Sequence, residues 1–124
     1  LTILNGENKA GGLQVQTRSG DWVNVETEPD TFVVNIGDLL MRWTNDQWIS
    51  TLHRVVNPPL DANAPHPRQS IVFFHQPNYD AMIECLPSCL DEAGKGKYPA
   101  VSSGDHLKSK FVKQTTFGGT QEVA

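Results

Sequence analysis

The sequence predicts an all-β fold, either a sandwich or a barrel, on three observations. Short runs rich in β-branched and aromatic residues recur along the chain, with Gly, Pro, Asn and Asp residues between them. Several runs alternate apolar and polar residues, which is the period of a half-buried strand. A helical period occurs only near the carboxyl end. The 124 residues have the size of one domain with its own core.

The expected strands are short and joined by tight connections. They cover residues 1–4, 13–16, 22–25, 31–36, 39–43, 51–56, 69–74 and 81–85. Ser19, Gly20 and Asp21 separate the second run from the third and predict a hairpin. Gly37 and Asp38 predict a tight turn before the run at 39–43.

One helix is expected near the carboxyl end. Ser102 and Asp105 have the spacing of an N-terminal capping box. Leu107 and Phe111 then lie on one helical face. The lysines of this region are most simply explained as the solvated face of that helix.

Composition excludes several classes of protein. With 38% hydrophobic and 19% charged residues, the chain is too apolar to be disordered. No apolar run is long enough for a membrane span, and the net charge of −4 disfavours a nucleic-acid partner. Cys85 and Cys89 are too few for a disulfide framework or a zinc site of usual spacing, so we expect free thiols in the reducing cytoplasm.

His53 is the first candidate for chemistry. It lies in a β-branched run, where alternation places Thr51, His53 and Val55 on one face and Arg54 on the other. Taken alone, a strand histidine is more often a packed residue than a metal ligand. No two histidines have a chelating spacing, so the residues by themselves define no metal site.

Arg68 and Ser70 are the second candidate. They stand two apart at the start of a strand, so both side chains point to the same face. A guanidinium beside a hydroxyl can bind a carboxylate through charge-assisted hydrogen bonds. The alternative is an arginine at a sheet edge, in water.

Nine blocks of the sequence follow the order of a known family. They are residues 1–4 (LTIL), 11–15 (GGLQV), 22–25 (WVNV), 32–40 (FVVNIGDLL), 44–45 (TN), 50–56 (STLHRVV), 68–74 (RQSIVFF), 97–101 (KYPAV) and 104–107 (GDHL). On these blocks, which are spread over nearly the whole chain, the sequence resembles the iron(II)/2-oxoglutarate dioxygenase superfamily. The resemblance is strongest to its isopenicillin N synthase-like branch.

The resemblance implies a double-stranded β-helix, or jelly roll, whose iron is held by a His-x-Asp pair and a distant histidine. By resemblance, His53 is that distant histidine, a ligand of Fe(II). Arg68 and Ser70 match the pair that binds the far carboxylate of 2-oxoglutarate, or a substrate carboxylate in isopenicillin N synthase-like proteins that do not use 2-oxoglutarate. The implied partner is therefore a small-molecule carboxylate, and the implied activity is that of an oxidoreductase.

One part of the family pattern is missing. The His-x-Asp motif precedes the strand at which this sequence begins, and neither His-x-Asp nor His-x-Glu occurs in it. Two of three iron ligands are thus absent, and a single imidazole should bind Fe(II) weakly or not at all. We expect the carboxyl-terminal half of a dioxygenase, inactive alone. The alternative is a non-catalytic jelly-roll module for carboxylate binding or assembly; a cupin, which gathers several histidines in one motif, is disfavoured.

On this interpretation, residues 1–90 form a partial jelly-roll core that is incomplete at its amino-terminal side. Residues 91–124 form a carboxyl-terminal extension with one short helix. By the family's strand order, the strands at 51–56 and 69–74 each lose a neighbour and become open edges. Apolar open edges pair readily with other chains, so we expect self-association, most simply as a homodimer.

Overall fold

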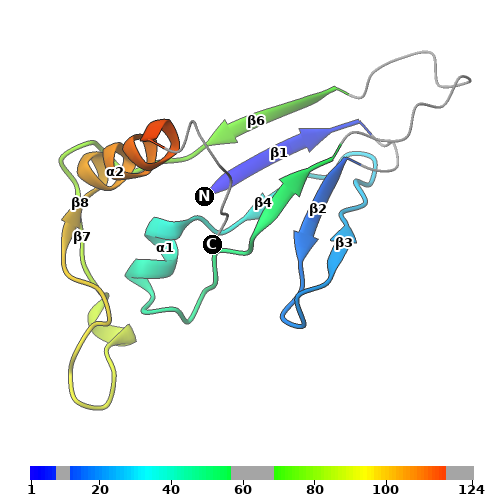
Figure 1. The fold of residues 1–124 in the computed structure, drawn as a ribbon. Helices are drawn as coiled ribbons and strands as arrows, with labels where there is room; N and C mark the ends of the chain where they lie inside the picture. The colour runs from blue at the N-terminus through cyan, green and yellow to red at the C-terminus, as the bar shows by residue number, and fades with distance from the viewer. Residues whose placement is uncertain (8–11, 57–68, 117–124) are drawn as a thin grey trace, which may run out of the picture.

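Two small antiparallel sheets face each other in the computed structural model, which describes residues 1–7, 12–56 and 69–116 (Figure 1). Two α-helices and a third, two-stranded sheet lie at one end of these sheets (Figure 1). The expected all-β architecture is therefore confirmed. Within the described ranges, no helix is long and apolar enough to cross a membrane.

The first sheet has the order β4-β1-β6. Its strands are β1 (Thr2–Gly6), β4 (Val33–Asn35) and β6 (Ser70–Phe74). The register sets Thr2 opposite Asn35 on one side and opposite Phe74 on the other. Because side chains alternate along each strand, these three residues lie on the same face of the sheet.

The second sheet has the order β3-β2-β5. Its strands are β2 (Leu13–Gln16), β3 (Trp22–Asn24) and β5 (His53–Val55). The predicted hairpin is confirmed, because β2 pairs with β3 through a turn in which Gly20 has a φ of 94°. A positive φ of this size favours glycine, which has no Cβ to clash. On its other side, β2 sets Val15 opposite His53.

The run at 39–43 is a helix, so the strand expected there is wrong. Helix α1 (Asp38–Trp43) begins at the Gly37–Asp38 pair that had indicated a turn. The reason is composition: leucine, methionine and arginine are good helix formers, and the run has no β-branched residue. Asp38 also lies in the first turn, where a negative charge is favourable.

Helix α2 (Ser103–Thr116) is the helix expected near the carboxyl end, and at 14 residues it is longer than the short helix we expected. The predicted cap is present, since the Asp105 backbone N–H donates to Ser102 Oγ at 3.1 Å. The strand β8 (Val101–Ser102) directly precedes α2 and pairs with the strand β7 (Met82–Ile83). Both strands have two residues, and the 3-10 helix η1 (Pro87–Cys89) lies between them in sequence. No local pattern had predicted β8.

A polar cluster fixes the loop between η1 and β8 onto the end of α1. Asp46 accepts a hydrogen bond from the Tyr98 hydroxyl at 2.7 Å and forms an ion pair with Lys97. Arg42 stacks over the Tyr98 ring, 4.7 Å from its centroid, and donates to the Pro99 carbonyl at 2.8 Å. This end of the molecule is thus held by groups far apart in sequence.

The buried core is small. Among the described residues, only Leu13, Ile83 and Cys89 are buried hydrophobics, and Ile83 is the one large side chain that is fully enclosed. Strands β5 and β6 are edges of their sheets, as expected. Along β6, Ile71, Val72, Phe73 and Phe74 are all substantially exposed.

Candidate functional site

The inner faces of the two sheets enclose an open cavity of about 190 Å³. Alternate residues of five strands, with one residue from the segment before β5, line it. They are Thr2 and Leu4 (β1), Val33 and Asn35 (β4), Ser70, Val72 and Phe74 (β6), Leu13 and Val15 (β2), Thr51, and His53 and Val55 (β5). The cavity is thus mainly apolar, with a few polar groups among its walls, which is typical of a small-molecule site.

His53 reaches this cavity from β5, with Thr51 and Val55 on the same side. Its Nδ1 lies 3.1 Å from the Thr51 carbonyl oxygen. A carbonyl oxygen can only accept, so this contact is a hydrogen bond only if Nδ1 carries the proton. The lone pair then belongs to Nε2. An imidazole oriented in this way by a backbone carbonyl is the usual form of a metal-ligating histidine.

Arg54 points to the opposite face of β5, as alternation predicts. Its guanidinium stacks over Trp22, 4.2 Å from the ring centroid, and its Nε donates to Gln14 Oε1 at 2.9 Å. These contacts hold one side of β5 against the outer face of the hairpin. They favour the orientation in which His53 faces the cavity.

Ser70 lines the same cavity from the facing sheet, as the first residue of β6. The structure therefore brings together two of the three residues singled out from the sequence. Arg68 and the proline-rich segment before it lie outside the described residues, so the expected pairing of Arg68 with Ser70 stays a prediction.

Two polar lining residues, Thr2 and Asn35, were not predicted from the sequence, whereas Thr51 had been placed correctly on the face of His53. The signal was available, because the i, i+2 alternation of β1 and β4 places Thr2 and Asn35 on the face of Leu4 and Val33. As single small polar residues among valines and leucines, they carry no motif that indicates a site.

The described residues do not provide a complete metal site. No group of three or more His, Cys, Asp and Glu side chains in this part of the chain is arranged to hold a metal ion. A stable iron site of two histidines and a carboxylate needs three such donors. His53 fits as one ligand, and the remaining donors of the expected set are not among the residues described.

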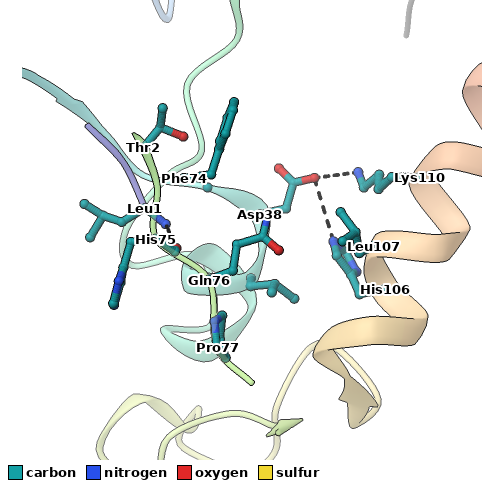
Figure 2. Close-up of a pocket in the computed structure, with 12 residues that line it drawn as sticks. Leu1, Thr2, Asp38, Phe74, His75, Gln76, Pro77, His106, Leu107 and Lys110 are labelled. Atoms are coloured by element: carbon teal, nitrogen blue, oxygen red, sulfur yellow. Dashed lines mark hydrogen bonds and ion pairs between the residues drawn. The ribbon is translucent and has the colours of Figure 1, made fainter. Parts of the chain in front are cut away.

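A second cavity, of about 200 Å³, lies between α2 and the start of α1 (Figure 2). Asp38 faces two residues of α2 across it: Lys110 Nζ lies 2.5 Å from Asp38 Oδ2, and His106 Nε2 lies 4.0 Å from the same oxygen (Figure 2). Thr2 and Phe74 line both cavities, so the two adjoin at the end of β1 and β6.

The ionisable groups of the second cavity change one another's pKa values. Burial alone raises the pKa of Asp38, but hydrogen bonds from Lys110 and Ser50, with the nearby positive charges, bring that pKa below its ordinary value. Burial is also the largest cause that lowers the pKa of His106, and the charges of Lys110 and Arg42 add to it. Both shifts favour a charged Asp38 beside a neutral His106.

Comparison with known proteins gives the same family from sequence and from structure. Residues 1–77 match the family model described as the 2OG-Fe(II) oxygenase superfamily. The chain is 40% identical over 113 residues to a homoarginine-6-hydroxylase of Oryza sativa subsp. japonica, covering 90% of this chain and 33% of that protein. It is 36% identical over 112 residues to a 2-oxoglutarate-Fe(II) type oxidoreductase of Emericella nidulans, covering 90% and 30%.

Solved structures with a similar fold include oxygenases of the same kind. A full-length Neurospora crassa protein, crystallised in complex with alpha-KG, superposes with a TM-score of 0.80 at 38% identity, over 91% of this chain and 34% of that one. A dioxygenase for auxin oxidation in rice superposes with a TM-score of 0.76 at 28% identity, over 91% and 37%. The chain thus spans about a third of the length of the proteins it matches.

Proposed function

Because this chain belongs to the 2OG-Fe(II) oxygenase superfamily, whose jelly-roll fold it shares, we propose that it forms the carboxyl-terminal part of a dioxygenase site. In this proposal His53 is one ligand of Fe(II), and Arg68 with Ser70 binds the far carboxylate of 2-oxoglutarate. The remaining iron ligands come from outside these 124 residues. The whole site would oxidise a small molecule, and this chain alone would be inactive.

The observation that carries the proposal is that His53 and Ser70 reach one cavity from facing sheets. A 2-oxo acid bound between them would be held at one end by the metal and at the other by a hydroxyl and a guanidinium. The apolar walls formed by Leu4, Val15 and Val72 would exclude water from it. Iron, when bound, supplies the oxidising chemistry, and this chain supplies position and a dry pocket.

The co-substrate half of the site is tested by titrating the 15N-labelled chain with 2-oxoglutarate in the absence of metal. We expect weak binding, with a Kd of about 1 mM, and shifts confined to amides around Ser70 and Val72. Arg68→Leu and Ser70→Ala should weaken these shifts, whereas Arg18→Leu, in the exposed hairpin turn, should not. Unchanged binding by Arg68→Leu would show that the assigned role is wrong.

The metal half is tested by anaerobic calorimetry with Fe(II). We expect no tight binding, because a lone imidazole gains no chelate effect and ferrous iron is low in the affinity order. The small heat that is observed should decrease further in His53→Ala. Tight binding of one Fe(II) per chain would contradict the proposal that the other ligands lie outside this chain.

Self-association is part of the same proposal. The open edges β5 and β6 expose apolar side chains, among them Val55 and Phe73, and an unpaired edge of this kind can pair with a second copy across a two-fold axis. Sedimentation velocity should detect a homodimer, and Phe73→Lys should shift it toward the monomer. A stable monomer of the native chain over the micromolar range would argue against the dimer.

A cytoplasmic location is also proposed, because Cys85 and Cys89 both remain free thiols.

A further inference from the structure

Helix α2 is attached to the rest of the molecule at two places of different kinds. Its first turn is fixed by backbone hydrogen bonds, from the Ser103 N–H to the Ala81 carbonyl at 2.9 Å and from the Gly104 N–H to the Tyr79 carbonyl at 2.8 Å. Ser103 and Gly104 are buried. These contacts do not depend on charge, so they define an attachment point that stays in place when ionisable groups titrate.

The next two turns are held mainly by side chains that face the second cavity. Lys110 and His106 approach the same Asp38 oxygen, and Leu107 is the apolar residue of α2 that lines this cavity (Figure 2). Phe111 and Val112 of these turns are more than half exposed. The carboxylate of Asp38 therefore connects the first turn of α1 with two residues of α2, one turn apart.

His106 occupies a position where a proton is disfavoured. Its side chain is only 15% exposed. The negative charge of Asp38 favours protonation of His106, whereas the positive charges of Lys110 and Lys113 on α2 and of Arg42 on α1 disfavour it. A further histidine, His75, lines the same cavity. A protonated His106 would be a further cation next to a carboxylate already paired with Lys110, in a poorly solvated position.

We propose that α2 is a hinged cover over the second cavity, latched to α1 by Asp38 and released when His106 takes up a proton. Release would pivot α2 about Ser103 and Gly104 and open the cavity. Because that cavity adjoins the inter-sheet cavity through Thr2 and Phe74, opening it would change access to the candidate site. The proposal does not depend on the iron or 2-oxoglutarate roles given above.

The latch is tested by amide hydrogen exchange of the native chain, read at residues 107–113 and corrected for intrinsic rates. Asp38→Asn and Lys110→Met should each accelerate exchange there by about two- to five-fold at pH 7.5, the range for a half-exposed ion pair. The double variant should be no faster than the faster single variant. Lys108→Met, an exposed lysine on the same helix with no ion pair to the described residues, is the matched control.

Two results would overturn the latch. One is unchanged exchange in Lys110→Met, which removes the contact from an exposed position and should leave the fold intact. The other is equal acceleration at Ile83, which would mean global rather than local opening.

The proton trigger is tested by the pH dependence of the same exchange. In the native chain, exchange at residues 107–113 should accelerate as the pH falls from 7.5 to 5, while the Ile83 amide stays protected. His106→Gln keeps a side-chain donor but does not titrate in this range, so it should abolish the acceleration. Opening that begins only where carboxylates titrate, at about pH 4, or that persists in His106→Gln, would exclude His106 as the trigger.

Discussion

The helical end of the molecule and its two-sheet end are held together in different ways. At the helical end, Ile83 is only 1% exposed, and Asp46, Arg42 and Tyr98 link α1 to the loop before β8. At the two-sheet end, apolar residues such as Phe73 and Val55 are more than half exposed on edge strands. The helical end therefore contains the one large side chain that is fully enclosed among the described residues, although Met82, Phe111 and Val112 are exposed there, and the two-sheet end presents apolar surface around a cavity.

The difference separates stability from function. The helical end is stabilised by contacts within this chain, such as those around Ile83 and Asp46, whereas the two-sheet end has walls suited to a ligand and edges suited to additional strands. The cavity with His53 and Ser70 belongs to the second kind of surface. Substitutions at the two ends should therefore differ in their effect on the free energy of unfolding.

The largest difference is expected between two isoleucines. Ile83→Ala removes a fully buried side chain and should lower the unfolding free energy by about 2–5 kcal/mol. Ile71→Ala, at a position 66% exposed on β6, should change it by less than about 0.5 kcal/mol. Urea unfolding followed by circular dichroism measures both. Similar losses in the two variants would mean that the two ends are equally enclosed in solution.

A smaller effect is expected at the cap of α2. Ser102→Ala removes the hydroxyl that accepts from the Asp105 N–H, and should cost about 1 kcal/mol. Ser109→Ala, which removes an exposed hydroxyl bonded to the His106 carbonyl within the helix, serves as the control and should be close to neutral. A cap variant as stable as its control would show that α2 contributes little to the stability of this end.

The smallest effect is expected at Asp46 and depends on pH. The hydrogen bond from Lys97, with that from Tyr98, lowers the pKa of Asp46. A lowered pKa in the folded state stabilises the fold above the unfolded pKa, and this contribution is lost as the pH falls through the folded value. The unfolding free energy of Asp46→Asn should therefore be lower than that of the native chain at pH 6, and the difference should shrink as the pH falls below the ordinary aspartate pKa of about 3.9. A constant difference between the two proteins across this range would contradict the assignment.

Most strands were predictable from the sequence because alternation and β-branched residues act locally. Helix α1 was predicted wrongly as a strand, because so short an apolar run shows no clear period; its helix-forming leucine, methionine and arginine were the local signal that favoured a helix. The two-residue β8 was missed for a related reason: such a short strand exists only because β7 lies beside it.

The candidate site was predictable to the same extent. Alternation along β5 correctly placed His53 opposite to Arg54, and the position of Ser70 at the start of β6 was correct. The group formed by Asp38, His106 and Lys110 was beyond sequence reasoning, since Asp38 lies about 70 residues from its partners and nothing local indicates that α2 folds back onto α1. Residue roles toward iron and 2-oxoglutarate rest on the family.

The pairing of β5 along a single side has a consequence for how this chain tolerates change. The three residues of β5 pair only with β2. Their register decides whether the imidazole of His53 or the guanidinium of Arg54 enters the cavity. Insertion or deletion of one residue in the segment leading into β5 would exchange them while keeping a similar set of backbone hydrogen bonds. Such a chain could remain folded and yet present the wrong side chain to a ligand, so the length of that segment is under a constraint that measurements of stability alone would not detect.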